Sequence, residues 1–330
     1  MKVEGKGGIS AKVIAKSRSS VNGQTVTTFE LEYPRFIHSE FMTHRLFSRN
    51  AASSRAIPVE KVIEQVEDNP AIPIHWGKNQ KGMQAKEECT ELVYQKYYSE
   101  LDGYDGYWTP REWAWRFCAK ESCKRAKEFS ESGYHKQVVN RILEPYQFIK
   151  VVVTATSFDN FFWLRCHSDA QPEIKELADC MYKAYQETNA VTLEPGQWHV
   201  PYIENFMVND SGEMEYFDSD GSQITLEEAL KVSASCCAQV SYRLLDTSLE
   251  KALRIYDTLV NSKPAHSSPF EHAATPMEKP NWRIDEDAWE EGVTHMDREG
   301  DLWSGNLKSF VQFRQLLEDH TCWKFEKPVD

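Results

Sequence analysis

Alternating apolar and polar positions near the start of the chain predict a β-hairpin. The runs Ile9–Ile14 and Thr25–Tyr33 are rich in β-branched residues and alternate apolar with polar positions, as half-buried strands do. Asn22-Gly23 between them is the dipeptide most typical of a tight hairpin turn. Residues 146–156 form another β-branched, apolar run, so we expect a further strand much later in the chain.

Apolar residues at helical spacing predict helices over most of the remaining chain. One of them, 226–238, begins after a capping box formed by Thr225 and Glu228. Another carries the apolar run Phe161–Leu164. The other expected helices cover 35–46, 58–69, 83–101, 110–132, 135–143, 171–188 and 248–261.

Two stretches depart from this periodicity. Residues 191–232 contain Pro195-Gly196 and an acidic run with glycine and serine, which predicts an irregular excursion. The tail is acidic and rich in tryptophan, and 301–317 within it is expected to be a loop leading into a helix. We therefore predict one domain over 1–272, with a C-terminal extension over 273–330 packed on it.

Composition narrows the class of protein. The chain has 330 residues and a formal net charge of -13, which disfavours binding to nucleic acid polymers and to anionic membranes. We find no apolar run of membrane-spanning length and no apolar signal core, so we expect a cytoplasmic protein. The eight cysteines form no CxxC pair and are expected to be free thiols, although Cys118 and Cys123 with nearby histidines leave a zinc site open.

One basic stretch stands out against this acidic background. Residues 43–58, THRLFSRNAASSRAIP, contain three arginines, a histidine, four hydroxyl side chains and an asparagine, but no carboxylate. Guanidinium forks and hydroxyl donors without a counter-charge suit a phosphate or a phosphorylated cofactor. The alternative is an arginine-rich helix terminus or loop whose charges pair with acids elsewhere in the chain.

The pattern HRxxSxNxxSxR over residues 44–55 resembles the signature of the flavin-dependent thymidylate synthases, RHRxxSxNExSxR. Three positions depart from that signature. Thr43 replaces the first arginine, Ala51 replaces the glutamate, and Ser54 stands where the family usually has glycine.

Four other segments resemble the same family. HSSPFEH at 266–272 is similar to the flavin-holding HxSPxEH segment, and its proline disfavours the helical zinc site that two histidines and a glutamate would otherwise allow. LRCHSDAQPEI at 164–174 resembles LRxxxxAQxEI, and 138–145 carries an arginine in the expected order before it. Residues 238–241 resemble the first flavin-contacting stretch.

The order of these segments differs from that of the family. The flavin-holding segments normally precede the signature, whereas here they follow it. This order indicates a circular permutation, which is physically reasonable when chain termini lie close together at a surface. Thr154 and Thr156 also stand where the family usually has Asn and Arg.

The resemblance implies an α+β fold, with one antiparallel sheet flanked by long helices, assembled as a homotetramer with shared active sites. It implies FAD as the cofactor, with NADPH and methylenetetrahydrofolate as co-substrates. The implied substrate is a pyrimidine deoxynucleoside monophosphate, dUMP, which is methylated to dTMP. The cofactors carry the bond-making chemistry, so the protein supplies orientation and charge.

The resemblance also assigns roles to individual residues, none of them as metal ligands. The expected cofactor ligands are His44, Arg45, Leu46, Asn50, Asn160, Ser241, Ser268 and Glu271. The expected substrate ligands are Glu40, Ser53, Ser54, Arg55, Arg141 and Arg165. At the reacting end, Arg165 stabilises negative charge on the pyrimidine, Ser53 donates a hydrogen bond, and His266 positions the flavin or the folate.

Several alternatives stay open at this point. Glu40 stands where the family commonly has glutamine, and a carboxylate can accept a hydrogen bond from the amino group of cytosine, so dCMP or hydroxymethyl transfer is an alternative outcome. Arg165 could instead pair with a nearby carboxylate. Gln312 and Arg314 of the tail are candidates to replace contacts that the altered signature loses. A non-catalytic flavin- or nucleotide-binding protein and an interaction protein are the other classes.

Overall fold

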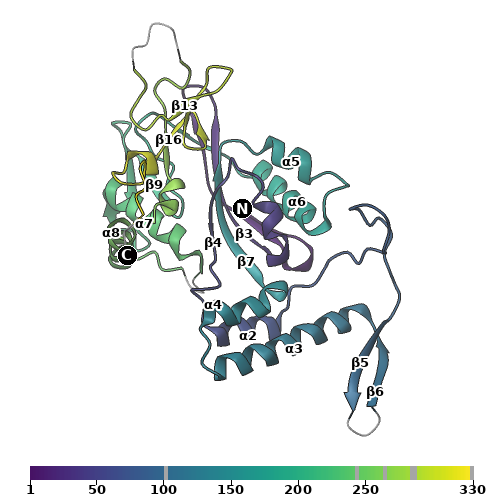
Figure 1. Ribbon diagram of the computed structural model, residues 1–330. Coiled ribbons are helices and arrows are strands. Elements are labelled where there is room, and N and C mark those ends of the chain that lie inside the picture. Colours follow the sequence, from purple (N-terminus) through teal and green to yellow (C-terminus); the bar gives the residue numbers. More distant parts are fainter. Residues whose placement is uncertain (100–102, 242–244, 263–265, 283–287, 328–330) are drawn as a thin grey trace.

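A central antiparallel sheet joins strands from distant parts of the chain (Figure 1). The computed structural model describes residues 1–99, 103–241, 245–262, 266–282 and 288–327. The strands run in the order β1-β2-β3-β7-β4, with β8 paired in parallel to β2. Their bounds are β1 Lys2–Glu4, β2 Ser10–Ser19, β3 Thr25–Pro34, β4 Ser48–Ala51, β7 Phe148–Ala155 and β8 Val191–Leu193.

The hairpin and the later strand predicted from the sequence are confirmed. Strands β2 and β3 pair antiparallel, and Gly23 in the turn between them has φ +76°, a conformation that glycine adopts without strain. Strand β7 pairs with β3 over its whole length, from Thr27↔Ala155 to Pro34↔Phe148. The Asn22-Gly23 turn therefore joins β2 and β3 as neighbours in the sequence, whereas β7 reaches β3 from a distant part of the chain.

Helices surround the sheet, so the α+β class is confirmed. The capping box of Thr225 and Glu228 is present at the start of α7, as predicted. The helix bounds are α1 His38–Phe41, α2 Val59–Asp68, α3 Arg111–Glu131, α4 Lys136–Val139, α5 Asp159–Arg165, α6 Pro172–Glu187, α7 Leu226–Ala238 and α8 Leu249–Asn261.

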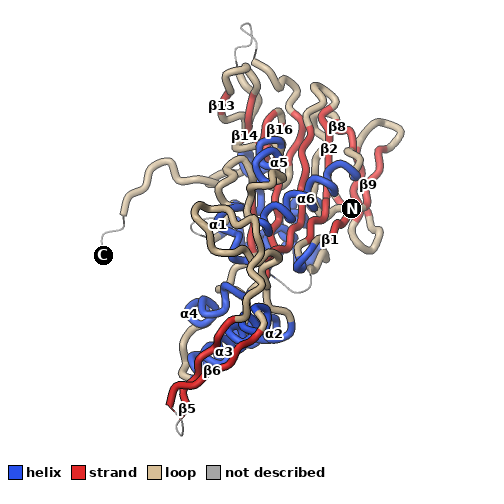
Figure 2. The backbone as a smooth tube through the Cα atoms, turned by 90° about the vertical axis from the view of Figure 1, so that its right-hand side faces the viewer, coloured by secondary structure: helices blue, strands red, loops and turns tan. Residues whose placement is uncertain are grey.

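The two faces of the sheet differ in character. One face is apolar, and its Phe29, Leu31 and Val153 pack against helices α5 and α6, which cover this side (Figure 1). The other face lies toward α7, α8 and the C-terminal strands, where Val26 packs against Phe310. Helices α2, α3 and α4 gather at one end of the sheet around a small core of their own, beyond which a hairpin projects (Figure 2).

A chain of buried polar side chains crosses the second face. Ser17 Oγ lies 2.8 Å from His199 Nδ1, and His199 Nε2 lies 2.8 Å from Thr28 Oγ1. Thr28 and Thr154 share a hydrogen bond of 2.6 Å, and Thr154 Oγ1 lies 2.8 Å from His272 Nδ1. Buried polar groups need hydrogen-bond partners. These hydrogen bonds therefore attach His199 and His272, two residues from later in the sequence, to the sheet.

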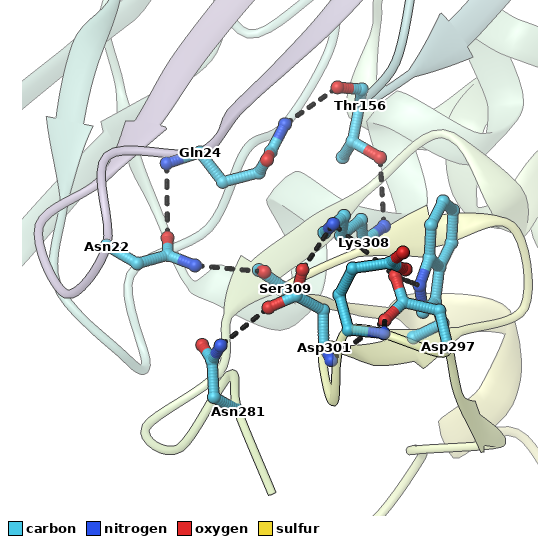
Figure 3. A network of polar contacts seen from close by, with 10 residues as sticks. Asn22, Gln24, Thr156, Asn281, Asp297, Asp301, Lys308 and Ser309 are labelled. Carbon is cyan, nitrogen blue, oxygen red and sulfur yellow. Dashed lines mark hydrogen bonds and ion pairs between the residues drawn. The ribbon is translucent and has the colours of Figure 1, made fainter.

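The C-terminal extension also lies on this face, against the β2–β3 turn (Figure 3). The backbone N–H of Lys308 donates to Thr156 Oγ1 at 2.8 Å, and Asn22 Nδ2 donates to Ser309 Oγ at 3.0 Å. Gln24 Nε2 donates to the Thr156 carbonyl at 2.7 Å. The strands of the extension are β12 Ala274–Pro276, β13 His295–Met296, β14 Leu302–Ser304, β15 Leu307–Lys308 and β16 Phe310–Gln312.

Outside the 35–46 region, three predicted elements are wrong. The helix expected over 83–101 is instead loop followed by strand β5 (Val93–Ser99), which pairs with β6 (Gly103–Thr109); residues 100–102 lie outside the described part. The segment 191–232 holds β8, a small sheet and the start of α7 rather than an irregular excursion. The strands of that sheet are β9 Asn205–Val208, β10 Met214–Phe217 and β11 Gln223–Ile224.

The third error lies in the tail, where the helix expected within 301–317 is replaced by short strands and a 3-10 turn, η6 (Phe313–Leu316). All three errors share a physical cause. Short strands are stabilised by cross-strand neighbours that a local pattern does not reveal. The first segment contains Val93, Tyr94, Tyr97 and Tyr98, residue types that favour strands.

The buried histidines predict a pH-dependent stability. Burial lowers the pKa of His199 and of His272 to about 3, below the ordinary value of 6.5. As the pH is lowered below about 6.5, these histidines become protonated in the unfolded chain but stay neutral in the native state. The free energy of unfolding therefore decreases as the pH is lowered. Each histidine contributes about 1.4 kcal/mol of that loss between pH 7.5 and 5.5.

Urea unfolding at both pH values measures this loss in wild type and in His199→Gln. The free energy of unfolding of the variant should fall less between the two pH values, by about 1.4 kcal/mol. An equal fall in both proteins would contradict the neutral, buried state of His199.

Candidate functional site

The centre of the signature lies on an edge strand of the sheet, which corrects the expectation that it follows a long helix. Only a 3-10 turn, η2 (Arg35–Ile37), and the single turn of α1 precede it. Strand β4 pairs with β7, whose edge would otherwise leave backbone groups unsatisfied. Residues 48–51 lie beyond the helix predicted over 35–46, and they form a strand because β7 supplies their hydrogen-bond partners.

Successive side chains of β4 point to opposite faces of the sheet, as they do in any strand. Ser48 lies opposite Thr154 and shares the polar face with it. Asn50 lies on that same face, and its Nδ2 donates to the Cys237 carbonyl at 3.3 Å. Arg49 points to the other side, where its Nη1 donates to the Phe41 carbonyl at 3.2 Å.

Arg165 at the end of α5 meets the start of the signature. Its Nε donates to His44 Nε2 at 3.0 Å, and its Nη1 lies 3.4 Å from a Glu40 carboxylate oxygen. Its Nη2 lies 3.5 Å from Thr43 Oγ1. Phe161, one helical turn before Arg165, packs edge-on against the His44 ring at 4.8 Å between centroids. The structure therefore brings together three predicted residues, Glu40, His44 and Arg165.

The charge state of His44 follows from this packing. Burial, together with the nearby guanidinium groups of Arg165 and Arg49, lowers its pKa to about 4. A neutral imidazole can present a lone pair on Nε2, which the Arg165 contact requires. His44 therefore acts as a fixed acceptor that orients Arg165.

Unpartnered buried atoms lie on the polar side of β4. Asn50 Oδ1 and His272 Nε2 are buried, and each lacks a hydrogen-bond partner among the described residues. The 3-10 turn η5 (Ser268–Glu271) packs against β4, so the flavin-type segment and the signature are neighbours. Orphaned acceptor and ring nitrogen atoms are what a bound ligand would satisfy, so the residues fit a polar cofactor.

A second cluster lies past the other end of β4. The backbone N–H of Arg55 donates to Ser53 Oγ at 3.3 Å, which closes a tight turn. Asn140, fully buried, donates from Nδ2 to the carbonyls of Ser54 and Ile57 at 2.6 and 3.0 Å. The turn is therefore held in place from the 3-10 helix η3 (Asn140–Tyr146).

Two arginines flank this turn. Arg55 and Arg141 are exposed, and Arg141 pairs with Glu144 at 3.0 Å. Glu144 also pairs with Arg35 at 3.1 Å and accepts a hydrogen bond from Ser54 Oγ at 3.4 Å. One carboxylate among three arginines leaves the cluster with net positive charge, which suits a phosphate.

The other predicted residues do not join these clusters within one chain. Arg45, Leu46, Asn160, His266 and Ser268 are exposed. The backbone of Ser241 lies in a 3-10 turn, but its side chain is outside the described part. Thr154 and Thr156, which replace Asn and Arg of the family, serve the internal contacts of the sheet with His272 and Lys308.

Sequence reasoning missed Asn140 and His199. Asn140 adjoins Arg141 in a segment already singled out, so its position was a usable signal. His199 carried no such signal, because its partners Ser17 and Thr28 lie far away in the sequence.

The described residues also set limits on metals and membranes. They contain no group of three or more His, Cys, Asp or Glu side chains that could hold a metal ion. All eight cysteines are free thiols, as predicted. None of the described helices is long and apolar enough to cross a membrane.

The fold and the donor set define an α+β protein with a candidate site for an anionic ligand. The family model of the thymidylate synthase complementing proteins matches residues 2–189, more than half of the chain. The chain therefore belongs to this family, the flavin-dependent thymidylate synthases, as its motifs predicted. A search of the curated proteins returns no match.

The matched region covers the signature and the segments of Arg141 and Arg165. Residues 238–241 and 266–272 lie beyond it, so the circular permutation stays a prediction. The packing of η5 on β4 supports that prediction, because it places the displaced segment beside the signature.

The buried amide of Asn140 predicts a stability loss. Asn140→Ala removes the hydrogen bonds to the carbonyls of Ser54 and Ile57, which should lower the free energy of unfolding by about 1–3 kcal/mol. Urea unfolding measures the change, with the exposed Asn189→Ala as the control. An equal effect of both substitutions would contradict the role of Asn140.

Proposed function

We propose that this protein methylates dUMP at C5 to give dTMP, with FAD as cofactor, NADPH as reductant and methylenetetrahydrofolate as the one-carbon donor. Family membership gives the thymidylate synthase type of activity. The observation that carries the specific proposal is the contact of Arg165 with His44, because it joins two motifs that are far apart in the sequence.

The reduced flavin supplies the hydride when bound, and the folate supplies the carbon. The residues proposed to hold FAD are His44, Arg45, Leu46, Asn50, Asn160, Ser241, Ser268 and Glu271. The unpartnered Asn50 Oδ1 supports this assignment, because a bound group can satisfy it. His266 is proposed to position the flavin or the folate from the same segment.

Arg165 is proposed to bind the pyrimidine and to stabilise negative charge that develops on its carbonyl oxygens. His44 holds the Nε donor, while the Nη contacts to Glu40 and Thr43 are long, at 3.4 and 3.5 Å. Hydrogen bonds of that length are weak, so these two donors can turn to a substrate at low cost.

The turn at Ser53–Arg55 is proposed to bind the 5′-phosphate. Ser53 carries a half-buried hydroxyl group there, and the buried Ser54 would bind the phosphate once its Oγ releases Glu144. Arg55 and Arg141 carry exposed guanidinium groups of the kind that bind phosphate in pairs of hydrogen bonds. Their exposure supports an assembly in which neighbouring copies complete each site, and we propose a homotetramer located in the cytoplasm.

We also propose a division of the chain into one catalytic domain and a C-terminal extension. The proposed catalytic domain, residues 1–272, contains every residue proposed to bind the cofactor or the substrate. The proposed extension, 273–330, packs on that domain. The hydrogen bonds of Lys308 and Ser309 to the β2–β3 hairpin region support this division.

The assay for this function combines the full chain with FAD, NADPH, methylenetetrahydrofolate and dUMP, and measures dTMP by mass spectrometry. Arg165→Ala should lower kcat/KM about 100- to 1000-fold, because a charge-stabilising donor is lost. The exposed Arg298→Ala should leave it unchanged. Flavin binding without product would favour a non-catalytic binding protein, and a colourless protein would favour an interaction protein.

Glu40 gives a second candidate function. Its carboxylate lies at the Arg165 contact, where it can accept a hydrogen bond from a cytosine amino group but cannot donate one to a uracil carbonyl. A C5 methylation or hydroxymethylation of dCMP is the activity that this chemistry favours.

Glu40→Gln separates the two candidates. If cytosine is the natural base, the ratio of kcat/KM for dUMP to that for dCMP should rise at least about 10-fold, because an amide can also donate to uracil. The ratio cancels any general loss caused by releasing Arg165. An unchanged ratio would remove Glu40 as the residue that selects the base.

A further inference from the structure

The C-terminal extension holds the HSSPFEH segment at both ends. Ser267 Oγ donates to the His320 carbonyl at 2.9 Å, and Arg314 Nη2 donates to the same carbonyl at 3.1 Å. Arg314 Nη1 forms an ion pair with a carboxylate oxygen of Glu271. Residues of the extension therefore contact this segment through both Ser267 and Glu271.

Gln312 connects the extension to the signature as well. Its side chain is almost fully buried, and its Nε2 donates to the Glu271 carbonyl at 3.2 Å and to Ser48 Oγ at 3.3 Å. It also donates to Asn306 Oδ1 at 3.0 Å. A single buried amide thus joins β16 to the signature strand and to the flavin-type segment.

The ion pair of Arg314 and Glu271 is shielded from water. Only 26% of the Arg314 side chain and 19% of the Glu271 side chain are exposed. Arg314 Nε is buried and has no partner among the described residues. A shielded guanidinium–carboxylate pair is directional, and removal of one member leaves the other charge uncompensated.

The backbone that carries Arg314 is fixed independently of this pair. Lys308 and Ser309, just before β16, bond to Thr156 and Asn22 of the sheet region (Figure 3). Strand β16 then pairs with β12, from Ala274↔Gln312 to Pro276↔Phe310. The position of Arg314 beside Glu271 is therefore supported by contacts other than the ion pair itself.

We propose that the C-terminal extension is a working part of the cofactor site, and that Arg314 is the positioning residue that holds the Glu271 carboxylate. The inference rests on the proposed function, which assigns Glu271 to FAD. It gives a role to the guanidinium that the extension adds, in a chain whose signature has Thr43 in place of an arginine.

A double-mutant cycle on the full chain tests the proposal, with FAD affinity measured by quenching of flavin fluorescence. Arg314→Met removes the charge and keeps the aliphatic stem, and it should weaken FAD binding about 10- to 100-fold, by analogy with the loss of residues that orient metal ligands. In a Glu271→Ala background the same change should have little further effect, because Arg314 acts through Glu271. Arg314→Lys should restore part of the affinity.

Arg298→Ala serves as the matched control, since it removes an exposed arginine of the same extension. Its FAD affinity should equal that of wild type. Circular dichroism confirms that each variant folds, and Arg314→Ala replaces Arg314→Met in the cycle if the latter does not.

The outcomes separate this inference from the proposed function. A wild-type protein that binds no FAD refutes the proposed function itself. If wild type binds FAD, unchanged affinity of the Arg314 variants overturns the role of the extension. Fully additive losses at Arg314 and Glu271 also overturn the positioning role, because the two residues would then act separately.

Discussion

The pairing of β4 with β7 is the constraint on which the rest of the site depends. It places Ser48 opposite Thr154 and makes the signature an edge of the central sheet. Because strand side chains alternate, the same four residues face two layers of the molecule. Arg49 then meets the layer of α1 and α5, while Ser48 and Asn50 meet the C-terminal half.

The two faces of the sheet therefore divide the work. Helix α5 packs on the apolar face. Its Phe161 and Arg165, which are one helical turn apart, both contact His44. The polar face takes up segments from far along the chain through His199 and His272, which burial keeps neutral. A permuted order of segments is compatible with this arrangement, because contacts in space do not depend on the position of the chain ends.

The sequence predicted the features that local chemistry determines. The Asn22-Gly23 turn and the capping box of Thr225 and Glu228 formed as expected, and the motif residues His44 and Arg165 meet. The misses depended on distant partners. Strand β4 needs the edge of β7, and the short strands of the extension need each other, so no local periodicity marks them.

The central claim is that one binding site forms around β4 from the signature, helix α5 and the 3-10 turn η5. A crystal structure with FAD and dUMP bound tests it most directly. The account predicts that Arg165 contacts the pyrimidine, that Arg55 or Arg141 contacts the phosphate, and that Glu271 faces the flavin, with neighbouring copies included. Ligands bound away from β4, with these residues on separate surfaces of the assembly, would contradict it.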